Sequence, residues 1–193
     1  MAMSAVLGPI HFWLYNKIGY QEQLTAAIAA LAQNNGWIEN ADSYQKTLPP
    51  LETVIDQGNI HGWLQGQIND AETRFADLVM KVMEPDAQRL NDLCEAAEVF
   101  GKEHAIHPDT AEQAYKALDD FFLNGMPCDR VNALIESAED HVYWQMSQDI
   151  HEQYWNNNSE PYYTIRKSVM NGMLEGSKYK LASDGVYYTI LTR

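Results

Sequence analysis

Apolar residues recur at helical spacing in the first part of the chain. The Ala-rich stretch at residues 25–32 favours helix, and Asn34-Asn35-Gly36 is a typical helix end. The pattern predicts a helix over residues 9–34. Its apolar face is formed by Leu14, Ile18, Leu24, Ile28 and Leu31.

Further helical patterns follow, separated by turn residues. Pro85 fits the first turn of a helix, and Asp109-Thr110 with Gln113 matches a capping box. The predicted helices span residues 51–83, with an interruption near Gly58-Asn59, then 87–103, 109–123 and 129–155.

The last part of the chain has a different pattern. A short helix is predicted over residues 161–174, and two β-prone runs at 178–183 and 186–192 flank Asp184-Gly185, a strong hairpin signal. We therefore predict a mainly α protein, an up-down bundle of four to five long helices. Residues 1–158 would form the bundle, and residues 159–193 would add a short helix and a β-hairpin packed on it.

An ungapped repeat places histidines in register. Residues 8–26 match residues 58–76 at eight of nineteen positions, which indicates a duplicated unit. The shared residues include a histidine, a tryptophan and a glutamate: His11 and His61, Trp13 and Trp63, Glu22 and Glu72. His141 is likewise followed by Glu152. Eleven residues of helix separate the two groups by about 16 Å, so a histidine could share a metal only with residues of other helices.

Counting outward from turns near Pro85, Pro108 and Met126 places three histidines at one end of a bundle. Helical bundles hold metals with side chains from facing helices. The first helix adds His11 or Glu22, depending on its direction. The predicted ligands of a transition-metal site are His11, His61, His104, His107, His141 and Glu22. Imidazole and carboxylate ligands suit iron, zinc, manganese, nickel and copper.

Histidines and a glutamate on several helices over about residues 9–157 resemble the hemerythrin-like and ferritin-like families. These families hold two iron ions between the helices of a bundle, so the resemblance implies iron as the metal, with redox, small-molecule binding or sensing as the function. The resemblance is architectural. Gln65 and Met146 stand where the hemerythrin pattern has a glutamate and an aspartate.

Composition restricts the partners. The chain of 193 residues has 13 Lys and Arg against 27 Asp and Glu, a formal net charge of −14. This charge disfavours nucleic acid and anionic membrane surfaces. No apolar run reaches the roughly 20 residues that cross a bilayer, and the N-terminus lacks a secretory pattern. With only two cysteines, we expect a cytoplasmic protein with reduced thiols.

Two alternatives to a metalloprotein remain open from the sequence. One is a non-catalytic interaction or regulatory protein that forms a homodimer by pairing β edges. The other is an enzyme that acts on a small organic substrate with histidine and Cys128, which lies at the start of the predicted helix at 129–155. In this enzyme, the tryptophans and tyrosines of the chain would line a pocket for the small organic substrate.

Overall fold

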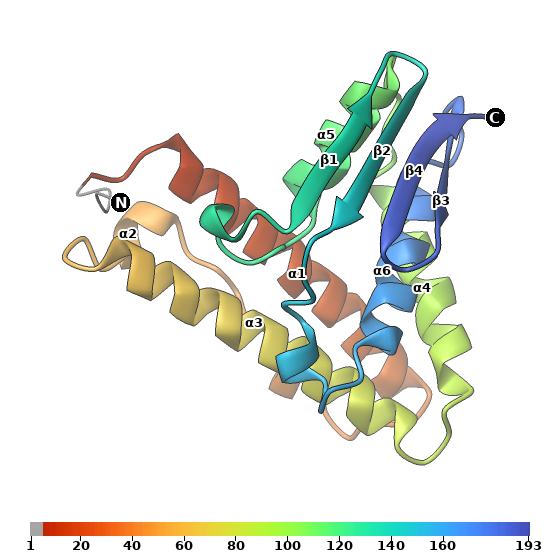
Figure 1. The fold of residues 1–193 in the computed structure, drawn as a ribbon. Helices are drawn as coiled ribbons and strands as arrows, with labels where there is room; N and C mark the ends of the chain where they lie inside the picture. Colours follow the sequence, from red (N-terminus) through yellow and green to blue (C-terminus); the bar gives the residue numbers. More distant parts are fainter. Residues whose placement is uncertain (1–5) are drawn as a thin grey trace.

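The computed structural model describes residues 6–193, which form helices and one small antiparallel sheet (Figure 1). The helices are α1 (Pro9–Asn34), α2 (Leu51–Val54), α3 (Ile60–Met83), α4 (Arg89–Glu103), α5 (Ala111–Phe121) and α6 (Glu160–Met173). The strands are β1 (Asn132–Ser137), β2 (His141–Met146), β3 (Tyr179–Ser183) and β4 (Tyr187–Thr192). Short 3-10 turns lie at Ala41–Tyr44, Pro127–Asp129 and Glu152–Tyr154. The mainly helical class is confirmed.

The two longest helices, α1 and α3, lie side by side and run in the same direction (Figure 1). The Tyr15 ring contacts the Trp63 ring, and further along the pair the Arg74 guanidinium binds the Glu22 carboxylate. Residues 35–59 lead the chain from the end of α1 back to the start of α3. Helices joined by such a crossover are not consecutive members of an up-down bundle.

The helix predicted over residues 129–155 is wrong, because this segment forms β1, β2 and a 3-10 turn. Along β2, buried residues alternate with partly exposed ones: Val142, Trp144 and Met146 are buried. This period of two, with β-branched and aromatic residues, is the pattern of a strand with one buried face. The helix-forming residues of Ala133-Leu134-Ile135-Glu136 obscured it. The predicted four to five long helices are therefore imprecise, since six helices of 4 to 26 residues are present among residues 6–193 and the bundle arrangement is not confirmed.

The sheet has the order β1-β2-β4-β3, and every neighbouring pair is antiparallel. The predicted hairpin is confirmed as β3 and β4, with Gly185 at a φ of 98° in the turn. β4 also pairs with β2, with Trp144 opposite Tyr188. The sheet therefore joins the C-terminal hairpin to the strands that precede α6.

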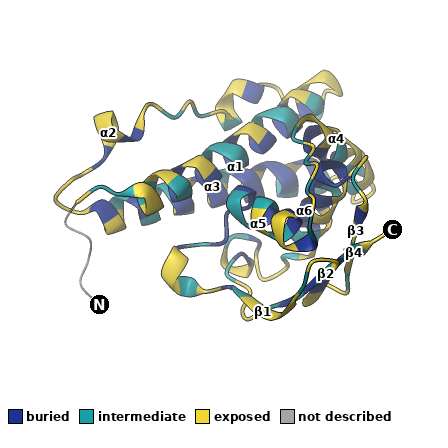
Figure 2. Ribbon diagram, turned by 90° about the horizontal axis from the view of Figure 1, so that it is seen from above, coloured by how far each residue is buried: buried dark blue, intermediate teal, exposed yellow. Residues whose placement is uncertain are grey.

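Buried residues gather where the helices face one another and the sheet (Figure 2). A larger apolar cluster contains the inner residues of α4, α5, α6 and the sheet, and a smaller one joins the first halves of α1 and α3. Residues 122–131, which follow α5, contact both clusters, and we call them the bridging segment. Phe122 and Val131 belong to the larger cluster, and Leu123 and Met126 belong to the smaller one. The candidate site lies along this bridging segment.

Candidate functional site

Two buried cations lie close to the bridging segment without a carboxylate partner. Lys17 of α1 is 3% exposed and Arg166 of α6 is 4% exposed. Within residues 6–193, neither side chain forms an ion pair with a carboxylate, and each cation lies over an aromatic ring. An unpaired buried charge is costly unless a partner or ligand compensates it. Such a pair in an acidic chain therefore marks a candidate site for an anion.

Lys17 lines a cavity of about 320 Å³ between α1, α5 and the bridging segment, which we call the Lys17 pocket. Its walls are Ile10, Trp13, Lys17, Tyr115, Asp119, Asn124, Gly125, Met126, Pro127, Arg130, Val131 and Asn132. A cavity of this volume is at the small end of the range for ligand pockets. It suits a compact organic molecule.

The register of α1 explains why Lys17 is buried. The residue follows Leu14 by three positions and precedes Ile18 by one, so it lies on the apolar face of the helix. Trp13 lies one turn earlier, and the Lys17 Nζ is 3.7 Å from the centroid of its ring. Burial, reinforced by the nearby Arg166 charge, lowers the pKa of Lys17 to about 8, although Asp119 and Asp120 act in the opposite direction.

Asn124 connects Arg166 to the pocket. Arg166 Nη1 donates to the Asn124 Oδ1 at 2.5 Å, and its guanidinium lies 4.8 Å from the centroid of the Phe122 ring. The remaining donors, Asn124 Nδ2 and Arg166 Nε, are buried and have no hydrogen-bond partner among residues 6–193. Buried polar atoms are normally paired. Of the two, Asn124 lines the pocket, and its unused donor favours a ligand with an acceptor oxygen.

The α5 wall supplies groups that can exchange protons with a ligand. Burial raises the pKa of Tyr115 to about 12, with a further contribution from Asp119, so its phenol is protonated at neutral pH. Asp119 accepts a hydrogen bond from the Asn132 Nδ2 at 2.9 Å. A carboxylate, a phenol and an amine therefore line the same small pocket.

A buried histidine and glutamate lie on the other side of the bridging segment. The His151 Nδ1 is 3.1 Å from the Glu72 Oε2, and the two residues are 0% and 1% exposed. The His151 ring stacks on Tyr162, whose hydroxyl also receives a hydrogen bond from Arg166. The pair borders a cavity of about 220 Å³ that shares Gly125 with the Lys17 pocket.

The conformation of the loop fixes His151. The Asp149 carboxylate accepts hydrogen bonds from the backbone N–H groups of His151 and Glu152 and from the hydroxyls of Ser159 and Tyr163. These bonds outweigh burial and lower the pKa of Asp149. The His151 Nε2 and Glu72 Oε1 are buried and unpartnered in the described chain. A connected set of buried polar groups thus extends from Glu72 to the Lys17 pocket.

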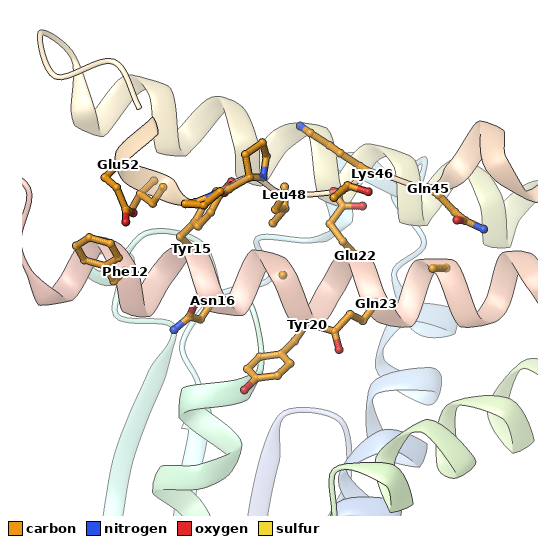
Figure 3. A pocket seen from close by; sticks show the side chains of 16 residues that line it. Phe12, Tyr15, Asn16, Tyr20, Glu22, Gln23, Gln45, Lys46, Leu48 and Glu52 are labelled. Atoms are coloured by element: carbon orange, nitrogen blue, oxygen red, sulfur yellow. The ribbon is translucent and has the colours of Figure 1, made fainter. Parts of the chain in front are cut away.

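A hollow of about 920 Å³ is an open trough between α1 and residues 45–52 (Figure 3). Three of its polar side chains have partners, although the Glu22 Oε2 is buried without one among residues 6–193. The Tyr15 hydroxyl donates to the Pro49 carbonyl, Lys46 pairs with Asp70, and Glu22 pairs with Arg74. Figure 3 shows Tyr15 and Leu48 between the helix and the returning segment, where they fill the space. The trough therefore holds fewer unsatisfied groups than the smaller Lys17 pocket.

The structure does not bring the predicted metal ligands together. His11 lies in the first turn of α1, where its Nδ1 accepts the Gly8 N–H, and His61 is exposed at the start of α3. His104 ends α4 with its Nδ1 2.9 Å from the Phe100 carbonyl oxygen, and His107 is exposed beyond it. Within residues 6–193, no three His, Cys, Asp or Glu side chains form a group that could hold a metal ion.

His141 and Glu22 have other partners. His141 lies on β2, not on a helix, and its ring nitrogens contact Asp140 and Glu136, which raise the pKa of the imidazole. Glu22 is buried against Arg74, and its burial raises the pKa of its carboxyl despite that cation. The two residues therefore lie in different elements and serve different contacts.

The cysteines are placed differently from each other. Cys128 is exposed in the 3-10 turn Pro127–Asp129, so its predicted place at the start of a long helix is wrong. Cys94 is half-buried in α4, and this burial raises the pKa of its thiol. No described contact links Cys128 to a histidine.

The interpretation of the sequence missed Lys17, Asn124 and Arg166. One available signal was a lysine within the apolar stripe of α1, directly between positions that become core. Glu72 was visible through the repeat, since Glu22 and Glu72 occupy equivalent positions and both are buried. Its partner, His151, depends on the fold, because the two residues are 79 positions apart.

Comparison with family models, curated proteins and solved structures found no match to this chain. The resemblance to hemerythrin-like and ferritin-like proteins therefore stays a prediction. Among residues 6–193, no helix is long and apolar enough to cross a membrane.

Proposed function

We propose that this protein binds a small monocarboxylate in the Lys17 pocket. The observation that supports this proposal is the pair of buried cations, Lys17 and Arg166, which lack a carboxylate partner in the described chain. A carboxylate oxygen can accept hydrogen bonds from an ammonium and from amide and guanidinium donors. A bound carboxylate would give Lys17 the ion-pair partner that Asp119 and Asp120, which act on it only from beyond ion-pair distance, do not provide.

The pocket walls favour a single negative charge over two. Asp119 forms part of the wall beside Lys17, and a second anionic group on the ligand would lie close to this carboxylate. Like charges in a partly buried site repel strongly because screening is weak there. The unpartnered Asn124 Nδ2 supports recognition of an oxygen acceptor on the ligand.

Isothermal titration calorimetry at low ionic strength tests this function with acetate, lactate, succinate and phosphate. Acetate and lactate are expected to bind, and succinate and phosphate to bind more weakly. The Lys17→Met variant should lose at least about tenfold in affinity, which corresponds to about 1.4 kcal/mol. Lys81→Met is the matched control, since Lys81 is exposed on α3 and its loss changes the net charge equally.

Absence of binding to the wild-type protein would overturn the proposal. So would equal affinity of the wild-type and Lys17→Met proteins, since the ligand would then occupy another site. Circular dichroism is used to check that both variants are folded before their affinities are compared.

The predicted transition-metal function has less support in this geometry, because it needs ligands that approach one another. Four of the six predicted ligands lie in separate contacts, and His61 and His107 are exposed. Metal analysis of the purified protein after anaerobic reconstitution with iron tests this prediction directly. Metal content below about a tenth of an equivalent would contradict it.

A further inference from the structure

We infer that Lys17 forms an imine with the carbonyl carbon of a 2-oxo monocarboxylate in its pocket. The inference rests on the proposed function, because the carboxylate of this substrate class would occupy the anion site. It adds a covalent step that anion binding alone does not require. The substrate class is a short 2-oxo acid such as glyoxylate or pyruvate.

The surroundings of Lys17 are those that favour a nucleophilic amine. Lysines become nucleophilic when they are desolvated or lie next to another cation. Lys17 is almost fully buried, has no carboxylate within ion-pair distance in the described chain and lies near the Arg166 charge. With its pKa near 8, the side chain has a neutral fraction roughly three-hundredfold larger than that of an ordinary lysine at neutral pH.

Different residues of the pocket can contact the two functional groups of a 2-oxo acid, its carboxylate and its carbonyl. The Asn124 Nδ2, whose amide is held by Arg166, offers a donor for the carboxylate, and Lys17 offers the amine for the adjacent carbonyl. Only a few non-hydrogen atoms lie between these groups in glyoxylate or pyruvate. A cavity of about 320 Å³ accommodates either molecule.

Asp119 and Tyr115 line the same pocket and can carry the protons of the reaction. The Lys17 ammonium gives a proton to Asp119 through a bridging water, because the two groups are not within ion-pair distance. The nitrogen lone pair then forms a C–N bond as the C=O π pair moves to oxygen. That oxygen takes a proton from Tyr115, and the resulting phenolate takes one from the nitrogen. The carbinolamine hydroxyl leaves as water with the proton held by Asp119, while the nitrogen lone pair forms the C=N bond. The sum is ammonium plus ketone to iminium plus water, with no oxidant or reductant.

Reductive trapping tests the imine. The full-length protein is incubated at pH 7.5 with pyruvate or glyoxylate and sodium cyanoborohydride, which reduces an iminium to a stable secondary amine. Intact mass shows how many adducts form, and peptide mapping identifies the modified lysine. We expect one adduct, located on Lys17, formed at least about tenfold faster than on Lys81 because of the larger neutral fraction.

Two controls separate the inference from the proposed function. Lactate, which has the carboxylate and no ketone, should bind in calorimetry and slow the trapping by pyruvate. Lys17→Arg should abolish the adduct, whereas Tyr115→Phe should slow its formation while lactate binding persists. Mapping of the wild-type protein needs no variant, so a folding defect would not leave the result undecided.

The outcomes distinguish failure of the imine from failure of the proposed function. Lactate binding without an adduct on Lys17 would overturn the imine and leave the proposed function standing. An adduct spread evenly over exposed lysines would also overturn the imine. Neither lactate binding nor an adduct would overturn both.

Discussion

The chemistry of Lys17 depends on its surroundings. Its ammonium is buried beside Trp13, and the charges that act on its pKa are Asp119, Arg166, Asp120 and Lys116. The lowered pKa means that the folded protein holds the Lys17 proton less tightly than the unfolded chain does. Folding is therefore penalised at every pH where the unfolded lysine is protonated.

This penalty leads to a prediction for Lys17→Met, which keeps the volume and removes the charge. Between a pKa of about 8 and the ordinary 10.5, the unfolded chain binds more protons, so the free energy of unfolding of the wild type rises with pH. Below pH 8 the whole penalty is present, about 3 kcal/mol at 1.36 kcal/mol per pKa unit. We expect Lys17→Met to be more stable at pH 7 by up to this amount and to lose the advantage by about pH 10.5. Urea unfolding at several pH values measures it, and a variant less stable at pH 7 would contradict the account.

Glu72 and His151 form the most deeply buried side-chain pair of the network. Each retains one unpartnered buried atom, so loss of either partner leaves the other side chain without its only described hydrogen bond. We expect Glu72→Leu and His151→Leu each to destabilise the fold by about 2 to 4 kcal/mol.

A double-mutant cycle isolates the contact. The double variant should be less destabilised than the sum of the single ones, with a coupling of about 1 to 3 kcal/mol in urea unfolding. Additive single effects would show that Glu72 and His151 do not interact in solution.

At the scale of elements, α4 and α6 form the closest helix pair. Gly101 and Gly172 face each other at the crossing, and a Cβ at Gly172 would overlap the Glu98 carbonyl oxygen. Because that neighbour is backbone, the helices must move apart to accept a methyl group. The position of Arg166 on α6 depends on this contact.

Gly172→Ala is therefore expected to destabilise the protein by about 2 to 3 kcal/mol through overpacking. Gly66→Ala is the matched control, because Gly66 is exposed in α3 and a Cβ there meets nothing within 4 Å. In that position alanine should stabilise by about 0.5 to 1 kcal/mol, since it favours helix. Thermal unfolding compares the two, and similar effects at both positions would contradict the close approach of α4 and α6.

The sequence pattern located elements well where a single periodicity dominated. α1, α3 and the β3–β4 hairpin lie close to their predicted bounds, because apolar spacing and Asp184-Gly185 act over short distances. Residues 129–155 were misassigned because helix-forming residues in β1 outweighed the alternation in β2. Local propensity does not decide such a segment, since pairing with β4 provides the stabilisation.

At the scale of the whole molecule, the site required contacts that no local pattern contains. The Lys17 pocket joins α1, α5 and the bridging segment, and Arg166 reaches it from α6 through Asn124. The prediction of a histidine site assumed that the helices form one bundle, in which the histidines lie at the same height along the bundle axis. This assumption does not hold, because α1 and α3 run in the same direction and His141 lies in a strand.

The net charge of the whole molecule does not describe the charge around the site. The formal net charge of −14 describes the chain as a whole, yet two cations lie in its interior without carboxylate partners in the described residues. The local potential of a site is set by the nearest charges and the low dielectric around them rather than by the total. An acidic protein can therefore hold a site for an anion.

The pKa of Lys17, with and without a monocarboxylate, tests the central claim most directly. Lysine labelled at Cε is titrated by NMR, and the Lys17 resonance is assigned by its absence in Lys17→Arg. We expect this resonance to titrate near pH 8 in the free protein. Its pKa should rise when acetate or lactate is added, because a bound anion stabilises the ammonium. A Lys17 resonance that titrates with the other lysines, or that neither anion shifts, would contradict the account.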